Sequence, residues 1–199
     1  PLRSNYVSEK VDLKNKNVID VACGGGLLVE ALHNFGANVT GIDISDVAIN
    51  TAQIHAKKTN CDVTYINGEA EELLPEKKEA FDVVTCLEAI EHVPDPQQLV
   101  KTCSDLCKPG GTIVFSTINR NPKSFLFAII GAEYILNLLP KGTHEFKKFI
   151  KPSELSNMMR NSNLEVKEII GMSYNPLTKK YWLGKDVDVN YLIHAEKSK

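Results

Sequence analysis

The stretch Asn17-Val-Ile-Asp-Val-Ala-Cys-Gly-Gly-Gly26 decides the fold. Its first residues form a short apolar, β-branched run, which predicts a strand over 17–22, and the glycines predict a tight turn into a helix over 27–35. Glycines at such a turn let the backbone approach a ligand closely. Asp43 ends the next strand, where a carboxylate can accept hydrogen bonds from both hydroxyls of a ribose. The turn at Gly24 and the acid at Asp43 therefore predict a site for a nucleoside-containing cofactor.

Segments typical of strands and helices alternate along the rest of the chain. This alternation predicts right-handed crossovers and a mostly parallel sheet. Two closing strands, 164–170 and 188–195, have no helix between them and are expected to pair as an antiparallel hairpin. The predicted fold is α/β, a Rossmann-like sheet of seven strands with an antiparallel terminal hairpin and helices on both faces. The other expected strands are 37–42, 62–66, 81–87 and 112–117, and the other expected helices are 46–58, 96–107 and 152–161.

Composition limits the classes of protein to which the chain can belong. Its 199 residues, 43% hydrophobic and 24% charged, fit one globular domain spanning 1–199. A formal charge of −2 provides no general basic field, so nucleic acid is not an expected partner. The five cysteines are scattered without a C-x-x-C pair, which indicates neither a disulfide framework nor a zinc site.

The glycine turn must also be assigned to a particular cofactor. The dinucleotide fingerprint G-x-G-x-x-G requires a third glycine, but Val29 occupies that position. The acidic residue Asp20 before the turn and the acidic stretch Gly68-Glu-Ala-Glu71, which includes Ala70, suit the positive sulfonium of S-adenosylmethionine. The turn therefore favours this cofactor, and an NAD-linked oxidoreductase is the alternative from another enzyme class.

Several longer strings resemble the ubiquinone biosynthesis O-methyltransferases, and the resemblance covers essentially the whole chain. The glycine turn and the E-H-V motif are shared with many methyltransferases, whereas P-K-G-T-H and V-D-V-N-Y are more specific to this family. The strings are Cys86-Leu-Glu-Ala-Ile-Glu-His-Val-Pro-Asp-Pro96, Ser116-Thr-Ile-Asn-Arg-Asn121, Gly131-Ala-Glu-Tyr134, Pro140-Lys-Gly-Thr-His-Glu-Phe-Lys-Lys-Phe-Ile-Lys-Pro152, Tyr174-Asn-Pro-Leu177 and Val187-Asp-Val-Asn-Tyr191.

The resemblance implies a class I methyltransferase that methylates a ring hydroxyl of a polyprenyl catechol or of demethylubiquinol. It also implies other quinone-biosynthesis enzymes as partners, and a few dozen residues ahead of Pro1. By position, Arg3 would meet the carboxylate end of S-adenosylmethionine, and Leu87 would lie beside the cofactor. Ala22 stands where the family usually has glycine, and its methyl group is expected to be tolerated if the local dihedrals are strand-like. Ala22, Gly24, Asp43 and Ala70 complete the expected cofactor site.

Acidic and imidazole side chains follow the fourth expected strand, at the edge of the sheet where α/β folds bind ligands. If the chain is helical there, Glu88, Glu91 and His92 can converge. With Asn119 they could hold Mg²⁺ or another divalent ion, which would lower the pKa of a catechol. The first alternative is His92 as a general base oriented by Glu88 and Glu91, and the second is that Glu91 and His92 cap the next helix and face solvent.

An apolar segment, 124–139, lies within a predicted insertion over 119–151. It is too short to span a bilayer, but it is followed by Lys141, Lys147, Lys148 and Lys151. This pattern is typical of peripheral contact with anionic membranes, although an ordinary core helix fits it equally well. We expect a cytoplasmic enzyme at the inner membrane, with the matrix face of the mitochondrial inner membrane as the alternative. A non-catalytic lipid-binding member of a quinone-synthesis complex is the second alternative function.

Overall fold

The computed structural model describes residues 2–124, 146–175 and 178–199. The regular elements follow the alternation expected from the sequence, with short additions. They are α1 (Leu2–Lys10), β1 (Asn17–Val21), α2 (Leu27–His33), β2 (Asn38–Asp43), α3 (Asp46–Thr59), β3 (Thr64–Asn67), η1 (Ala70–Leu73), α4 (Leu74–Lys77), β4 (Phe81–Leu87), α5 (Pro96–Leu106), β5 (Cys107–Ile118), α6 (Pro122–Ser124), η3 (Phe146–Lys148), α7 (Pro152–Arg160), β6 (Leu164–Asn175), β7 (Lys180–Gly184) and β8 (Asn190–Lys197).

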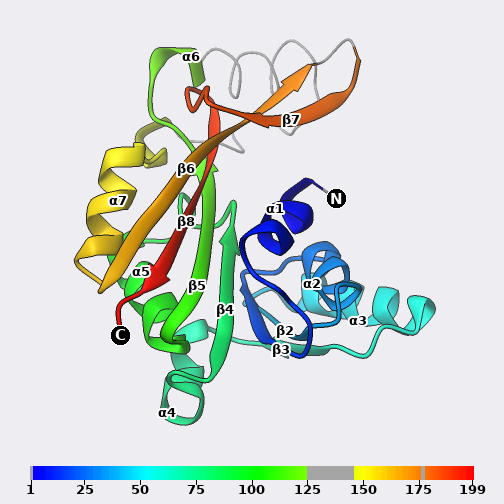
Figure 1. Cartoon of the computed structure of the whole chain (residues 1–199). Coiled ribbons are helices and arrows are strands. Elements are labelled where there is room, and N and C mark those ends of the chain that lie inside the picture. The colour runs from blue at the N-terminus through cyan, green and yellow to red at the C-terminus, as the bar shows by residue number, and fades with distance from the viewer. Residues whose placement is uncertain (1, 125–145, 176–177) are drawn as a thin grey trace.

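The strands form one sheet in the order β3-β2-β1-β4-β5-β8-β6-β7 (Figure 1). β1 to β5 pair in parallel, whereas β8 pairs antiparallel with both β5 and β6. The Rossmann-like fold and the antiparallel closing pair are therefore confirmed. The expected strand count of seven was one short, because β7 adds an antiparallel edge strand beside β6.

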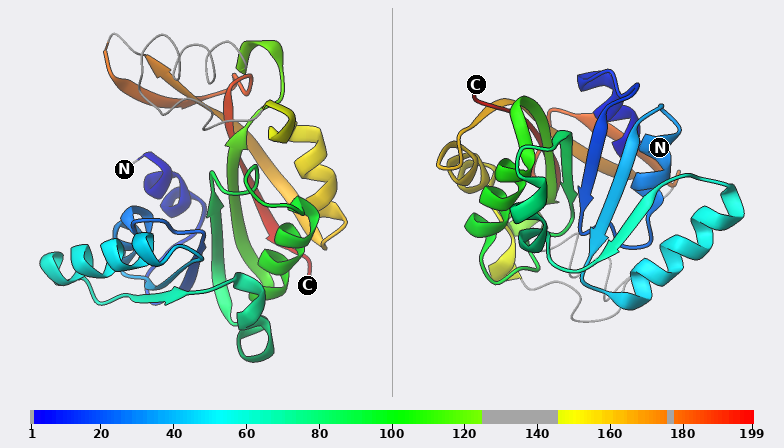
Figure 2. Two further views of the ribbon diagram at one scale, coloured as in Figure 1. Left: turned by 180° about the vertical axis from the view of Figure 1, so that it is seen from behind. Right: turned by 90° about the horizontal axis from the view of Figure 1, so that it is seen from below.

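Buried side chains alternate between the two faces of the central strands, as a pleated strand requires. On β4, for example, Val83 belongs to one apolar core and Val84 to the other. The helices α5 and α7 contact β4, β5, β6 and β8, while α2 and α3 contact β1, β2 and β3. Figure 2 shows these two helical layers on opposite sides of the sheet. The expectation of helices on both faces is confirmed.

The helix α1 and the strand β7 were not expected from the sequence, nor were the short helical pieces η1, α4, α6 and η3. α1 and β7 have weak apolar patterns. Residues 108–111 form an irregular piece within β5, since Phe81 pairs with Cys107 and Val83 with Thr112. The left-handed conformation of Gly110 accommodates this irregularity.

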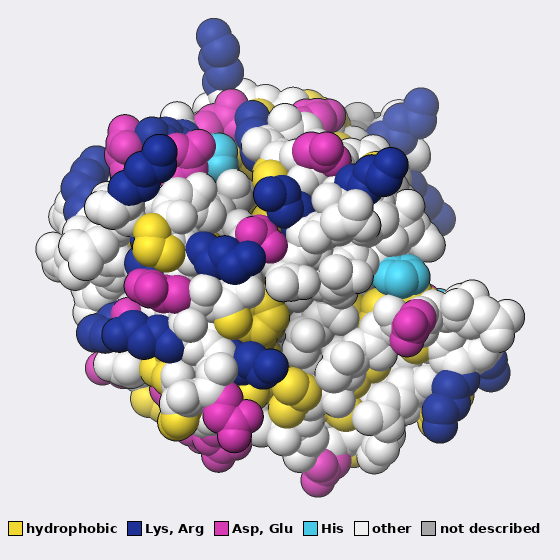
Figure 3. Space-filling model, turned by 60° about the horizontal axis from the view of Figure 1, so that its bottom comes forward, with side chains coloured by type: hydrophobic (Ala, Val, Ile, Leu, Met, Phe, Trp, Pro, Cys, Tyr) yellow, Lys and Arg dark blue, Asp and Glu magenta, His cyan; other side chains and the backbone are white. Residues whose placement is uncertain are grey.

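The expected apolar segment 124–139 lies almost wholly outside the described residues. Within the described part of the chain, no helix is long and apolar enough to cross a membrane. On the face drawn in Figure 3, cationic and anionic side chains are interspersed, in keeping with the small net charge. The surface visible there provides no broad basic area of the kind that nucleic acid requires.

Candidate active site

The glycine turn and Asp43 are brought together, as the sequence predicts. The backbone N–H of Gly24 donates to Oδ2 of Asp43 at 2.8 Å, and the N–H of Ser45 donates to Oδ1 at 2.8 Å. Gly24 and Gly26 both have positive φ angles, which glycine adopts without steric cost. The carboxylate is thus fixed at the end of β2, with lone pairs left to accept hydroxyl groups of a ligand.

Ala22 does not have the strand-like dihedral angles under which its methyl group was expected to be tolerated. Its φ angle is +57°, so the residue is left-handed rather than strand-like. An L-residue other than glycine loses roughly 1–2 kcal/mol in this conformation. The expectation of strand-like dihedrals was therefore wrong, and Ala22 holds the turn at a cost in free energy.

A cavity of about 360 Å³ opens directly beside this turn. Its walls come from the ends of β1 and β2, from residues 68–71 and from residues 93–95, just before α5. Apolar side chains such as Leu99 mix with the carboxylates of Asp43 and Glu69. Ala70 lines the same cavity and is buried. An apolar space edged by acids suits a nucleoside base with its ribose.

Asp20 is buried beneath the turn and is hydrogen-bonded to a side chain of β4. The hydroxyl of Thr85 on β4 donates to its Oδ1 at 2.6 Å. Burial, opposed by the Thr85 hydrogen bond and reinforced by the nearby Asp43 carboxylate, raises the pKa of Asp20 to about 7. This acid is therefore close to half protonated at neutral pH, and a positive charge nearby would favour its ionised form.

Glu88 lies at the end of β4 and is held by groups from three other elements. Its carboxylate accepts from Nη2 of Arg3 at 2.8 Å, from the hydroxyl of Ser116 at 2.7 Å, and from Nδ2 of Asn190, which is 3.1 Å from each oxygen. The residue adopts a φ angle of +56°, a strained conformation often found at functional sites. Leu87, immediately before it, is half-buried against the apolar core beneath α1 and α2. Arg3 is thereby held at this edge of the sheet.

Glu91 and His92 follow in a turn rather than a helix, so the helical convergence expected for them does not occur. Glu91 is buried, and the hydroxyl of Thr117 donates to its Oε2 at 2.8 Å. Burial, reinforced by the charge of Glu88, raises the pKa of Glu91 to about 7. His92 is exposed. The capping alternative is wrong, because Asp95 caps α5 by accepting from the N–H of Gln98.

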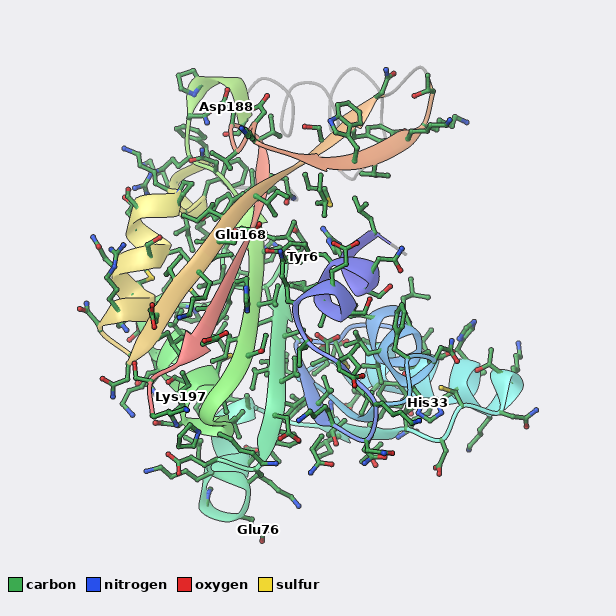
Figure 4. The ribbon with its side chains drawn as sticks, in the orientation of Figure 1. Tyr6, His33, Glu76, Glu168, Asp188 and Lys197 are labelled. Atoms are coloured by element: carbon green, nitrogen blue, oxygen red, sulfur yellow. The ribbon has the colours of Figure 1, made fainter. Side chains whose placement is uncertain are left out.

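The helix α1, which carries Arg3, is bound to β6 in the antiparallel part of the sheet. The Tyr6 hydroxyl donates to Oε2 of Glu168 at 2.6 Å, and Nζ of Lys10 lies 2.7 Å from the same oxygen. Figure 4 shows Tyr6 and Glu168 pointing toward one another between α1 and β6. Hydrogen bonds from Lys10 and Tyr6 lower the pKa of Glu168. The position of Arg3 thus depends on contacts made by distant residues of the same helix.

Comparisons with known proteins match the chain to methyltransferases. A family model described as a methyltransferase domain matches residues 19–115. The ubiquinone biosynthesis O-methyltransferase of Marinobacter nauticus is 57% identical over 98% of this chain and 83% of that protein. The enzyme of the same name from Pseudomonas entomophila is 58% identical over 98% of this chain and 84% of that protein.

The chain belongs to the ubiquinone biosynthesis O-methyltransferase family.

Solved methyltransferases share the fold at low sequence identity. Magnesium protoporphyrin IX methyltransferase from Synechocystis, with bound S-adenosylhomocysteine (SAH), has a TM-score of 0.72 and 18% identity, covering 98% of this chain and 80% of that one. A putative methyltransferase from Bacillus halodurans has a TM-score of 0.71 and 20% identity, covering 98% and 99%. The predicted family and class I fold are confirmed, and the chain is an S-adenosylmethionine-dependent O-methyltransferase. The oxidoreductase alternative is set aside.

The four side chains expected to bind a divalent ion do not form a metal site among the described residues. They are Glu88, Glu91, His92 and Asn119. Across residues 2–124, 146–175 and 178–199, no three His, Cys, Asp or Glu side chains form a group that could hold a metal ion. Glu88 already accepts four hydrogen bonds or ion-pair contacts, Glu91 is bonded to Thr117, and Nδ2 of Asn119 donates to the carbonyl of Val187 at 3.0 Å. As arranged, these residues do not fit a divalent ion.

Four polar residues of the site were not identified from the sequence: Thr85, Ser116, Thr117 and Asn190. Each is the partner of an acid that was identified. Ser116 and Asn190 lie within strings that are typical of the family, but a string alone does not reveal contacts. Their signal is the strand register, because antiparallel pairing of β5 and β8 places Ile118 opposite Asn190 and Thr117 opposite Tyr191.

Proposed function

We propose that this enzyme transfers the methyl group of S-adenosylmethionine to a ring hydroxyl of a polyprenyl catechol or of demethylubiquinol in ubiquinone biosynthesis. The names of its relatives support the pathway. The observation that carries the reaction is Glu91, a buried carboxyl group with a pKa near 7, on the same edge of the sheet as the turn at Gly24 and Asp43. S-adenosylmethionine supplies an electrophilic methyl group on a sulfonium.

In this proposal the residues of the cavity and those around it hold the cofactor in a fixed direction. Asp43 accepts hydrogen bonds from the ribose hydroxyls, and the backbone around Gly24 and Ala22 approaches the amino-acid end. Arg3 binds the carboxylate of that end, and Asp20 beneath the turn favours a positive ligand. Ala70 lines the space for the base, and Leu87 packs beside the cofactor at the end of β4.

Glu91 is the general base of the proposed reaction. A phenol has an ordinary pKa of about 10, so its oxygen must lose a proton to become a good nucleophile. A carboxylate with a pKa near 7 is better matched to this proton than one near 4.5. The proton passes from the phenol to Glu91, the phenolate oxygen bonds to the methyl carbon, and the electron pair of the broken bond stays on sulfur. His92, exposed on the same turn, is the alternative base. No step is assigned to a divalent ion.

Methylation of a soluble catechol tests the proposal. We expect Glu91→Gln to lower kcat by about 100-fold or more, since general bases typically contribute this much. His92→Gln, the matched control on the same turn, should change kcat by less than about 10-fold. Turnover measured with and without EDTA reports the contribution of a divalent ion, and we expect turnover to persist in EDTA. A wild-type enzyme that binds SAH but methylates no catechol would refute the proposed function, and a larger loss in the His92 variant would move the base to His92.

We also propose that residues 1–199 are one domain whose segment 119–151 contacts the substrate and an anionic membrane, at the cytoplasmic face of the inner membrane. This contact would give access to prenylated substrates and to other enzymes of quinone synthesis. Support comes from the exposed Lys147, Lys148 and Lys151, which follow an apolar stretch in the sequence. Changing all three to glutamate should abolish flotation with vesicles that contain anionic lipid. Equal flotation of both proteins would contradict membrane contact through these lysines.

A further inference from the structure

The side-chain amide of Asn190 has a fixed orientation. Its Nδ2 lies 3.1 Å from each carboxylate oxygen of Glu88. A carboxylate accepts hydrogen bonds and an amide nitrogen donates them, so the NH₂ group must face Glu88. The carbonyl oxygen Oδ1 must then point away from Glu88. The reverse orientation would place two acceptors against each other beside the half-buried ion pair of Glu88 with Arg3.

Oδ1 of Asn190 has no hydrogen-bond partner among the described residues, although it is buried. Nε of Arg3, whose Nη2 pairs with Glu88, is likewise buried without a partner in the part of the chain that the structure describes. A buried polar atom left unsatisfied costs about 1–3 kcal/mol, so native proteins rarely retain one without a reason. The arrangement is that of a site completed by a ligand, with Asn190 requiring a donor and Arg3 an acceptor.

The position of Asn190 in the sheet indicates which ligand supplies the donor. The nucleoside cavity lies over the ends of β1 and β2, whereas β8 is separated from β1 by β4 and β5. Glu88 links Asn190 to the proposed base, because it accepts from Nδ2 of Asn190 and its charge raises the pKa of Glu91. Thr117, the partner of Glu91, lies opposite Tyr191, the neighbour of Asn190 on β8, so Glu91 and Asn190 approach the end of the sheet from its two faces. The donor is therefore assigned to the methyl acceptor, and a contact with the cofactor is an outcome of the test.

We propose that Oδ1 of Asn190 accepts a hydrogen bond from the second ring hydroxyl of a catechol while the first hydroxyl faces Glu91. Asn190 is thus a specificity-determining residue that distinguishes vicinal diphenols from monophenols, and Glu88 acts through it as a positioning residue. This inference rests on the proposed O-methylation. Orienting one hydroxyl at Asn190 also directs methylation to its neighbour, since the two ring oxygens cannot exchange places without losing that bond.

The test compares kcat/KM for a soluble catechol with kcat/KM for the corresponding monophenol. Wild-type enzyme should prefer the catechol by about 10- to 100-fold, the range expected for one buried hydrogen bond. Asn190→Leu keeps the size of the side chain and removes its acceptor, so the preference should fall to nearly one, mainly through loss of catechol turnover. Ser116→Ala is the matched control, because it also removes a hydrogen bond from Glu88 but leaves Oδ1 of Asn190 in place. It should keep the preference.

SAH titration and thermal unfolding accompany each variant, and Asn190→Ala replaces the leucine variant if the latter does not fold. A preference that persists without the Asn190 side chain overturns the assignment while leaving the proposed function intact. Weakened SAH binding with an unchanged preference also overturns it, because Asn190 would then serve the cofactor. If wild-type enzyme binds SAH and methylates neither phenol, the proposed function fails and this inference fails with it.

Discussion

Ala22 is the residue at which the sequence and the backbone disagree most clearly. Gly24 and Gly26 of the same turn also have a positive φ. The sequence predicted the turn and its proximity to Asp43, because glycines after a strand allow the tight, positive-φ turn that other residues disfavour. It could not predict the dihedral angle of Ala22, which the surrounding backbone imposes on a residue that does not prefer it.

Replacing Ala22 with glycine should therefore stabilise the protein. Relief of left-handed strain contributes roughly 1–2 kcal/mol, and the greater chain entropy of glycine in the unfolded state offsets roughly 0.5–1 kcal/mol of it. We expect a net gain of about 0.5–1 kcal/mol, measured by urea unfolding, together with tighter SAH binding by calorimetry. Ala48→Gly in the first turn of α3 is the control, and it should destabilise the protein. A loss of stability in the Ala22 variant would contradict the strain argument.

At the scale of elements, predictability followed the strength of the apolar pattern. The strands β1, β2 and β4 and the helices α3 and α5 were predicted within a few residues, because each buries a regular face, whereas β5 was predicted only from residue 112 onward. β7 was missed, since most of its side chains are exposed at the edge of the sheet. α1 was missed because it buries few residues, chiefly Tyr6 and Val7. The acids of the site were found from the sequence, whereas their partners depend on strand register and therefore required the structure.

The packing of α1 against the sheet can be tested by removing one of its hydrogen bonds. Tyr6→Phe removes the hydrogen bond to Glu168 but retains the buried ring, so the expected loss of stability is about 2 kcal/mol. SAH binding should weaken as well, because the same helix carries Arg3 into the site. Ser8→Ala is the control: its hydroxyl donates to the carbonyl of Asn5 within α1 and does not reach the sheet. Unchanged SAH affinity in the Tyr6 variant would show that the helix holds its place without this bond.

At the scale of the whole molecule, two buried acids couple folding to pH in the same direction. Burial raises the pKa of both Asp20 and Glu91 to about 7, whereas both titrate near their ordinary values in the unfolded chain. The folded state therefore binds more protons than the unfolded state between about pH 4 and 7. The stability that each acid contributes is complete below about pH 4, declines as the pH rises to about 7, and changes little above that. Glu168, whose pKa is lowered, acts oppositely and only at acid pH.

Asp20→Asn isolates one of these two contributions. Asparagine stays neutral at every pH and retains an oxygen that accepts from the Thr85 hydroxyl. The slope of unfolding free energy against pH, which can reach about 1.4 kcal/mol per pH unit for each group, should fall by about half between pH 5 and 7. The variant should therefore be more stable than wild type at pH 8, by up to about 4 kcal/mol, and nearly equal to it at pH 4. Urea unfolding at each pH measures this difference. Parallel curves for the two proteins would mean that Asp20 is already ionised in the folded state, stabilised by Arg3 and Thr85 against the cost of its burial.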